Sequence, residues 1–388
     1  MNKVNRESIK QLIESEDNAT VSLYLPTHRF PTSEHITEDK IRFKNLIRSA
    51  KEALSEKGID DAIVAQIIGE LENGIYENDA FWQNTTDGLA VFCSPAGLRY
   101  FHLPMECEEK VSVGDRFDVA PLLALDSYDT YYYLLALAMH RPSLFKGDMY
   151  GLELVDIELP KSPEEALGID EMHSNSKTVR AGGGYGPGNP PSGSHGQGDS
   201  RQAGQEERLK YFRIIEDKIL SSTVVEPHVP LLLAGTEDEV SGYRESSKNK
   251  LLLKSHLSGN YTESAPHEIH ASSWPLIVDE LNNKERAQEV DKVNNLLGTG
   301  RASTNLEEIT SAAEEGRVDT LLIAMFAMTR DTVKDSSELV RKLVFPENYE
   351  SGRLASCARK VFDQGGKIVA LYKDDMPAGA FEAATYRY

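Results

Sequence analysis

Residues 131–159, YYYLLALAMHRPSLFKGDMYGLELVDIEL, decide the fold of the middle of the chain. Their apolar runs predict three successive strands, Tyr131–Met139, Ser143–Lys146 and Gly151–Leu159. The dipeptides Arg141-Pro142 and Gly147-Asp148 supply turns between these runs, because Pro and Gly favour turn geometry. Three strands joined by such short turns predict an antiparallel β-meander.

A Gly-rich segment follows the predicted meander. Residues 182–198 read GGGYGPGNPPSGSHGQG and contain eight Gly and three Pro. This composition cannot pack a core or hold regular structure, so it predicts a mobile loop. After the loop, the spacing of Leu209, Phe212, Ile215 and Ile219 predicts an amphipathic helix over about 205–220. The loop therefore leads into a helix.

Strands and helices alternate on both sides of this middle region. Before it, the sequence predicts a strand at Val21–Leu25, helices at about Glu38–Leu54 and Asp60–Ile75, and strands at Leu89–Cys93 and Leu98–Leu103. After it come a strand at Pro230–Ala234, the unassigned segment Gly235–His270, helices at about Pro275–Leu297 and Asn305–Glu315, a strand at Val318–Ala324, helices within Ser336–Phe362 and a strand at Lys367–Leu371. Gly365-Gly366 is expected to end the last helix.

These patterns predict a mixed α/β and α+β protein. A length of 388 residues is typical of two or three domains. The expected domains are an N-terminal α/β domain at 1–125, a middle domain at 126–265 with the Gly-rich loop 182–198, and a C-terminal α/β domain at 266–388.

Composition limits the classes of function. With 42 Lys and Arg against 62 Asp and Glu, the net charge of −20 is too acidic for a protein that coats nucleic acid, so any RNA contact must be local. The N-terminal residues show no export signal, and the longest apolar stretch, Leu321–Met328, is far short of the ~20 residues of a membrane span. Three cysteines without CxxC spacing, Cys93, Cys107 and Cys357, favour a reducing cytoplasm.

The long N-terminal helix is expected to be both amphipathic and basic. Apolar residues that fall near one predicted face are Ile41, Leu46, Ile47 and Leu54. The remainder of the helix carries Lys40, Arg42, Lys44, Arg48 and Lys51. A run of this kind favours a solvated face.

The Gly-rich loop matches no phosphate-binding motif. Neither GxxxxGK[ST] nor GxGxxG fits it, and its prolines lack the N–H donors that hold a phosphate. Its tip, His195, Gly196, Gln197 and Gly198, is small enough to enter a narrow cavity, with the amide of Gln197 as its functional group. A second interpretation, a solvated insertion whose charges are incidental, stays open on these residues alone.

Histidines give two further candidates. His28 and Arg29 follow the first strand, where α/β proteins place ligands, although local backbone contacts would also satisfy His28. The segment His267-Glu268-Ile269-His270, with His256, lacks the spacing of a metalloprotease motif, so these histidines are expected at the surface or in hydrogen bonds. No metal or cofactor is predicted, and no G-x-S-x-G motif supplies a nucleophile.

Three stretches in order carry a resemblance to a known family. They are Val21–Arg29 with the basic segment Ile41–Leu46; the meander, the loop with Gly196-Gln197 and the helix after it; and Gly316–Ile323, Gln364–Leu371 and the ending Tyr386–Tyr388. Together they resemble the bacterial relatives of the archaeo-eukaryotic class-1 peptide-release factors and Pelota. The resemblance covers essentially the whole chain and implies a three-domain architecture with a C-terminal domain of Pelota type.

The resemblance also implies a role at the ribosomal A site. In such release factors a Gly-Gly-Gln tip lies at the peptidyl-transferase centre, where the glutamine positions water against the peptidyl-tRNA ester. Here His195 replaces the first glycine of that motif, and the codon-reading tetrapeptide Asn-Ile-Lys-Ser is absent from the N-terminal domain. By the same resemblance, Gln197 would be the catalytic residue, and candidate rRNA contacts are Arg180, Arg201, Lys210 and Arg213.

Two functions follow as hypotheses. The first is a ribosome-associated factor that occupies the A site of idle or stalled ribosomes, in hibernation or rescue, without reading stop codons. The second is a hydrolase that acts on peptidyl-tRNA or another ester through the Gly196-Gln197 loop. The expected partners are the ribosome and its rRNA, with a translation GTPase by analogy, and neither DNA nor a membrane is expected.

Overall fold

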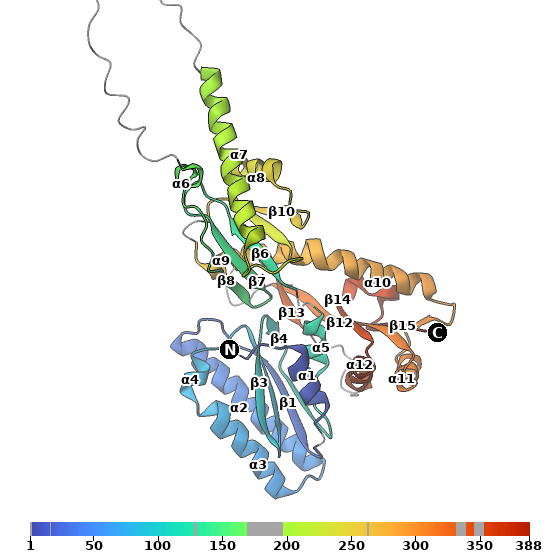
Figure 1. Ribbon diagram of the computed structural model, residues 1–388. Helices are drawn as coiled ribbons and strands as arrows, with labels where there is room; N and C mark the ends of the chain where they lie inside the picture. Colours follow the sequence, from blue (N-terminus) through green and yellow to red (C-terminus); the bar gives the residue numbers. More distant parts are fainter. Residues whose placement is uncertain are drawn as a thin grey trace, which may run out of the picture. The chain divides into compact units, whose positions relative to one another are not determined.

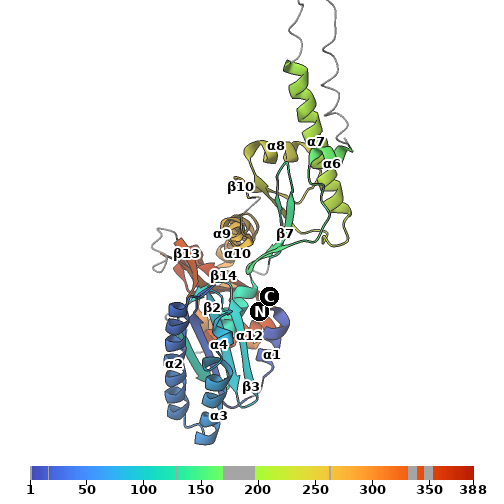
Figure 2. The ribbon, with the colours of Figure 1, turned by 90° about the vertical axis from the view of Figure 1, so that its left-hand side faces the viewer.

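The computed structural model describes residues 2–15, 17–127, 130–168, 197–261, 264–330, 339–344 and 353–388 (Figures 1 and 2). Its contacts divide the chain into two compact units. One unit combines Met1–Asp129 with Lys284–Tyr388, and the other is Thr130–Asn283. The predicted N-terminal and C-terminal domains thus share one unit, and the predicted boundaries 1–125, 126–265 and 266–388 stay a prediction.

The first sheet of the two-segment unit is antiparallel throughout. Its order is β3 (Gly97–Leu103), β2 (Gly88–Ser94), β1 (Thr20–Pro26) and β5 (Lys110–Gly114). Helices α2 (Ser33–Glu56) and α3 (Asp61–Leu71) are inserted between β1 and β2 and cover one face of this sheet (Figure 2). Shorter elements complete this segment: α1 (Arg6–Ile13), the π-helix η1 (Glu72–Tyr76), α4 (Asp79–Trp82) and α5 (Ala120–Asp126).

Helix α2 corrects one part of the predicted amphipathic pattern. Its buried side chains are Asp39, Phe43, Leu46, Ile47, Ala50 and Leu54. Ile41 was expected on this face but is 56% exposed. At about 100° per residue, position 41 lies roughly 160° away from position 43, so it cannot share the buried face.

The second sheet of this unit contains the two strands predicted at its core. Its order is β11 (Ala302–Ser303), β15 (Glu382–Tyr386), β12 (Val318–Arg330), β13 (Leu339–Leu343) and β4 (Glu106–Cys107), with β14 (Lys367–Tyr372) parallel to β12. Its helices are α10 (Asn283–Leu296), α11 (Leu306–Glu314) and α12 (Arg353–Asp363). β4 joins the two segments of the unit, because Glu106 and Cys107 pair with Lys342 and Leu343.

Part of the helical prediction for 336–362 is wrong. Leu339–Leu343 forms β13, because it pairs with both β12 and β4, and sheet pairing overrides the local preference of so short a segment. β15 was not predicted, whereas α12 ends as expected: Gly365 has a φ of 72°, which glycine adopts readily. A Cβ on Gly366 would lie 2.6 Å from Cγ1 of Val361, which explains the second glycine.

The middle unit confirms the predicted meander. β6 (Tyr132–Ala136), β7 (Ser143–Asp148) and β8 (Gly151–Leu154) pair antiparallel in succession. β9 (Leu231–Gly235) and β10 (Leu252–Ser258) extend the sheet in parallel, which gives the order β10-β9-β6-β7-β8. The segment left unassigned by sequence therefore contains a strand of the same sheet.

Helices cover both faces of the middle sheet (Figure 1). α7 (Gln197–Ser221) and α8 (Glu237–Ser246) pack on one face, and α9 (Pro266–Ile277) packs on the other. The short α6 (Pro163–Leu167) precedes α7, and the π-helix η4 (Val278–Asn282) follows α9. No helix in the described ranges is long and apolar enough to cross a bilayer.

Candidate functional site

The loop between β1 and α2 is fixed by hydrogen bonds to the turn before β2. The backbone N–H of Thr27 donates to the carbonyl of Asp87 over 3.1 Å, and the Thr27 hydroxyl donates to the carbonyl of Thr86 over 2.7 Å. The hydroxyl of Thr85 donates to the carbonyl of His28 over 2.8 Å. These bonds hold His28 and Arg29, both candidates from the sequence, in a defined position.

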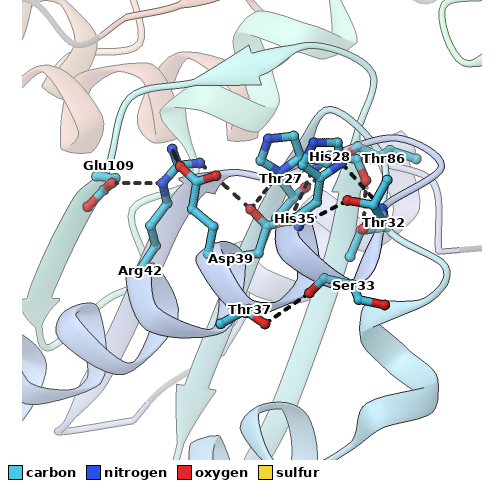
Figure 3. Close-up of polar contacts among 12 residues, drawn as sticks. Thr27, His28, Thr32, Ser33, His35, Thr37, Asp39, Arg42, Thr86 and Glu109 are labelled. Carbon is cyan, nitrogen blue, oxygen red and sulfur yellow. Dashed lines mark hydrogen bonds and ion pairs between the residues drawn. The ribbon is translucent and has the colours of Figure 1, made fainter. Parts of the chain in front are cut away.

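Asp39 of α2 lies at the centre of the polar contacts around this loop (Figure 3). Its side chain is 1% exposed, and it accepts the backbone N–H of His28 at Oδ2 over 3.1 Å. The Nδ1 atom of His28 lies 2.9 Å from Oδ1 of the same carboxylate, and Nη1 of Arg42 lies 3.7 Å from that oxygen. Burial raises the pKa of Asp39, while contacts with His28 and Arg42 act in the opposite direction.

His35 adds a second imidazole to this cluster. Its ring stacks on that of His28 with centroids 4.1 Å apart and planes inclined by 4° (Figure 3). The backbone N–H of Thr32 donates to Nδ1 of His35, and the Thr32 hydroxyl accepts the backbone N–H of His35, so both residues cap the start of α2. Because nitrogen lone pairs lie in the ring planes, two parallel rings do not direct them at one metal ion.

Arg29 forms an ion pair next to the cluster. Its Nη2 lies 2.8 Å and its Nε 3.1 Å from Oδ2 of Asp87, and both side chains remain partly exposed. Phe30 follows with a φ of 56° and a side chain that is 71% exposed. The loop therefore holds a paired arginine and presents an aromatic ring to solvent.

The contacts of the cluster hold the loop in place. Asp39 and His28 resemble the orienting half of a catalytic triad, but no hydroxyl or thiol nucleophile among the described residues is hydrogen-bonded to the His28 ring. In the same ranges no group of three or more His, Cys, Asp or Glu side chains is placed to hold a metal. This arrangement fits the positioning of a surface loop for binding.

The sequence singled out His28 and Arg29 but missed their acidic partners. Asp39 sits in the apolar stripe of α2, between Ile36 and Phe43, where an acid requires a buried partner. That signal was available in the sequence. The partnership of Arg29 with Asp87 had no such signal, because 58 residues separate them.

The other sequence-predicted site residues belong to the middle unit. α7 begins at Gln197, eight residues before the predicted start. The prediction that the loop extends to 198 is therefore wrong for Gln197 and Gly198, which lie in the first turn of this helix, and Arg201 lies in the next turn. Lys210 and Arg213 are exposed farther along α7, opposite the buried Tyr211, Phe212 and Ile215. Arg180, His195 and Gly196 lie outside the described residues.

The histidines considered as metal ligands make other contacts. Nε2 of His256 lies 3.0 Å from Oε1 of Glu237, and Nε2 of His270 lies 2.8 Å from the carbonyl of Asp148. The ring of His270 also stacks on Trp274 at 5.9 Å. Each of the two therefore lies at a separate hydrogen-bonded position of the middle unit.

Comparison with known proteins identifies the segment that carries the resemblance. Residues 131–317, slightly less than half of the chain, match the family described as bacterial archaeo-eukaryotic release factor family 3. This segment is similar to the bacterial relatives of the archaeo-eukaryotic release factors. The matched segment contains the meander, α7 and the whole region between α7 and β12. No curated protein matches the chain.

Several solved structures are similar to this chain at low identity. An archaeal translation termination factor, aRF1, is 14% identical over 98% of this chain and 96% of its own, with a TM-score of 0.23. Pelota of Archaeoglobus fulgidus is 12% identical over 77% and 79%, with a TM-score of 0.32. Pelota of Thermoplasma acidophilum is 12% identical over 100% and 95%, with a TM-score of 0.26. TM-scores this low leave the family match as the informative comparison.

Proposed function

We propose that this protein is a ribosome-associated translation factor that occupies the A site of idle or stalled ribosomes, in hibernation or rescue, without reading stop codons. The observation that carries the proposal is the match of residues 131–317 to the release-factor family. The matched segment includes the meander and α7, whose first turn contains Gln197 and Gly198. A translation GTPase as partner and a cytoplasmic location stay predictions.

The exposed face of α7 supports a local contact with rRNA. Lys210 and Arg213 lie three positions apart on its solvent side, as phosphate-contacting residues must. The whole chain carries a net charge of −20, so bulk attraction to RNA is absent and a few such contacts have to position the protein. Arg180 and Arg201 are proposed to add to them.

Co-sedimentation with 70S ribosomes tests the proposal. Vacant ribosomes should retain the protein in a saturable manner, with affinity that falls between 50 and 200 mM salt, and a tRNA bound in the A site should displace it. Lys210→Gln with Arg213→Gln should weaken binding, whereas the matched control Lys248→Gln with Lys250→Gln, also exposed in the middle unit, should not. Absence of binding to both vacant and stalled ribosomes would contradict the proposal.

The alternative, a hydrolase of peptidyl-tRNA or another ester, differs at Gln197. A hydrolase would release the peptide from stalled complexes, and Gln197→Ala would abolish release while binding persists. A binding factor would release no peptide above the spontaneous rate in either form. The measurement is peptide release from purified stalled ribosomes, with Gln202→Ala, on the same helix, as the control.

A further inference from the structure

The exposed face of α2 carries a row of cations that the polar cluster does not use. Between positions 40 and 51 the helix has five Lys or Arg and no acid, in a chain whose net charge is −20. Two of the five, Lys40 and Arg42, are paired: Lys40 with Asp79, and Arg42 with Glu38, Asp39 and Glu109. The remaining three are Lys44, Arg48 and Lys51, all exposed.

These three cations share one face of the helix. Positions 44, 48 and 51 are separated by four and three residues, which places them in one row, about 10 Å long at 1.5 Å per residue. Within the described part of the chain, no acidic side chain forms an ion pair with any of them. Arg48 donates to the amide oxygen of Asn45 over 3.4 Å, and Nζ of Lys44 lies 5.7 Å from the ring centre of Tyr76.

The row continues mainly through uncharged side chains, with one acid one turn after Arg48. Continued in both directions, it contains Thr37 and Ile41 before Lys44 and Ser55 after Lys51. Of the acids that follow, Glu52 lies four positions after Arg48, the spacing that also separates Lys44 from Arg48, and Glu56 lies farther round the helix. Ile41, 56% exposed, adds an apolar surface at one end of the row. We call Ile41, Lys44, Arg48 and Lys51 the α2 stripe.

We propose that the α2 stripe binds consecutive phosphates of an RNA strand, a second RNA contact in addition to α7; this inference rests on the proposed ribosome function. Three regularly spaced cations complement a line of phosphates, and Arg48 offers a planar fork of donors suited to phosphate oxygens. The exposed apolar side chain of Ile41 gives a sugar or base a non-polar neighbour. Because the chain as a whole is acidic, the contact made by α2 is expected to be local, through this narrow row.

The salt dependence of ribosome binding gives the decisive measurement. For single-stranded RNA each phosphate contact contributes about 0.7 to the slope of log K against log salt, so Lys44→Gln/Arg48→Gln/Lys51→Gln should lower the slope by about 2. Over the range from 50 to 200 mM salt, the advantage of wild type over this variant should shrink roughly 16-fold. The control Lys248→Gln/Lys250→Gln/Lys254→Gln removes the same charge from exposed positions of the middle unit and should leave the slope unchanged.

Two further readouts separate the outcomes. Ile41→Ala should weaken binding without altering the salt slope, because no charge is lost. Hydroxyl-radical footprinting of the rRNA at saturating protein should show protected nucleotides that the triple variant fails to protect. All of the altered side chains are exposed, so circular dichroism should show an unchanged fold.

The results overturn different claims. If wild type does not bind ribosomes, the proposed function fails and the α2 stripe loses its partner with it. If wild type binds and the triple variant keeps the same slope, only the stripe is wrong. If the slope falls but rRNA protection is unchanged, the stripe contacts an acidic protein, and the RNA assignment is overturned.

Discussion

Helices α2 and α7 each bury one carboxylate against a sheet, but the two carboxylates have different hydrogen-bond and charge partners. α2 has 24 residues and α7 has 25, and each packs along one face of its unit's sheet. Asp39 of α2 receives an N–H and the Nδ1 of His28 and lies near Arg42. Glu216 of α7 is 5% exposed and accepts the backbone N–H of Lys248 at Oε1 over 2.8 Å.

Among the described residues Glu216 forms no ion pair. Its Oε2 has no hydrogen-bond partner among the described residues, and neither has the buried hydroxyl of Tyr243. Burial, and then the charge of Glu216, raises the pKa of Tyr243 far above its usual range. Asp39 is thus supported by His28 and Arg42 and fixes a candidate binding loop, whereas Glu216 is supported by a single backbone amide and ties α7 to the segment after α8.

The largest expected effect is the loss of Asp39. Asp39→Ala should lower the free energy of unfolding by about 3 kcal/mol, because it leaves the His28 N–H and the neighbouring charges without their buried acceptor. Urea denaturation of the full chain measures this. Asp79→Ala, which removes the exposed partner of Lys40, is the control and should change stability little. A cost for Asp39→Ala no larger than the control would end the distinction between the two helices.

The contribution of Glu216 to stability should depend on the shape of its side chain more than on its charge. Glu216→Ala should cost about 1–2 kcal/mol, because the Lys248 N–H loses its acceptor, whereas Glu216→Gln keeps an oxygen in place and should be nearly neutral. The same urea titrations compare the two variants. If the glutamine variant is as unstable as the alanine variant, the charge of Glu216 is required and the two carboxylates are alike.

The pH dependence of stability sharpens the same contrast. Burial raises the pKa of Asp39 above its ordinary 3.8 in the folded state. A group with a raised folded pKa gives its full stabilisation below the unfolded pKa and loses it as pH rises through the folded pKa. Relative to Asp39→Asn, wild type should therefore lose stability as pH rises from below 3.8. Thermal unfolding across acidic buffers tests this, and a difference that grows in the opposite direction would contradict it.

The sequence predicted elements well where local pattern decides them and less well where distant partners do. The meander and the strands β12 and β14 follow from apolar runs and Gly or Pro punctuation, and all of them form. The prediction of helices within Ser336–Phe362 fails at β13, because these five residues form a strand only through pairing with β12 and β4. Predicting that Ile41 is exposed requires knowing which face of α2 is buried, and the buried Asp39 and Phe43 define that face.

The candidate site shows the same division. His28 and Arg29 were found because residues after a strand commonly meet ligands, but their acids lie 11 and 58 residues away along the chain. Hydrogen bonds between residues so far apart along the chain produce no periodic pattern in the sequence. The residues proposed from the Gly-rich loop depended on composition and resemblance, and Arg180, His195 and Gly196 lie outside the described part of the chain.

The smallest expected effect concerns Phe30, at the end of the loop that Asp39 fixes. Its φ of 56° is a left-handed conformation that a bulky side chain adopts only at a cost, whereas Asn tolerates it. Phe30 is 71% exposed, so its replacement removes little packing. Phe30→Asn should raise the free energy of unfolding by up to about 1 kcal/mol in urea titrations. In an Asp39→Ala background the loop is no longer held in place, and the same substitution should then bring no gain. An equal gain in both backgrounds would show that the strain at Phe30 is independent of the Asp39 contacts.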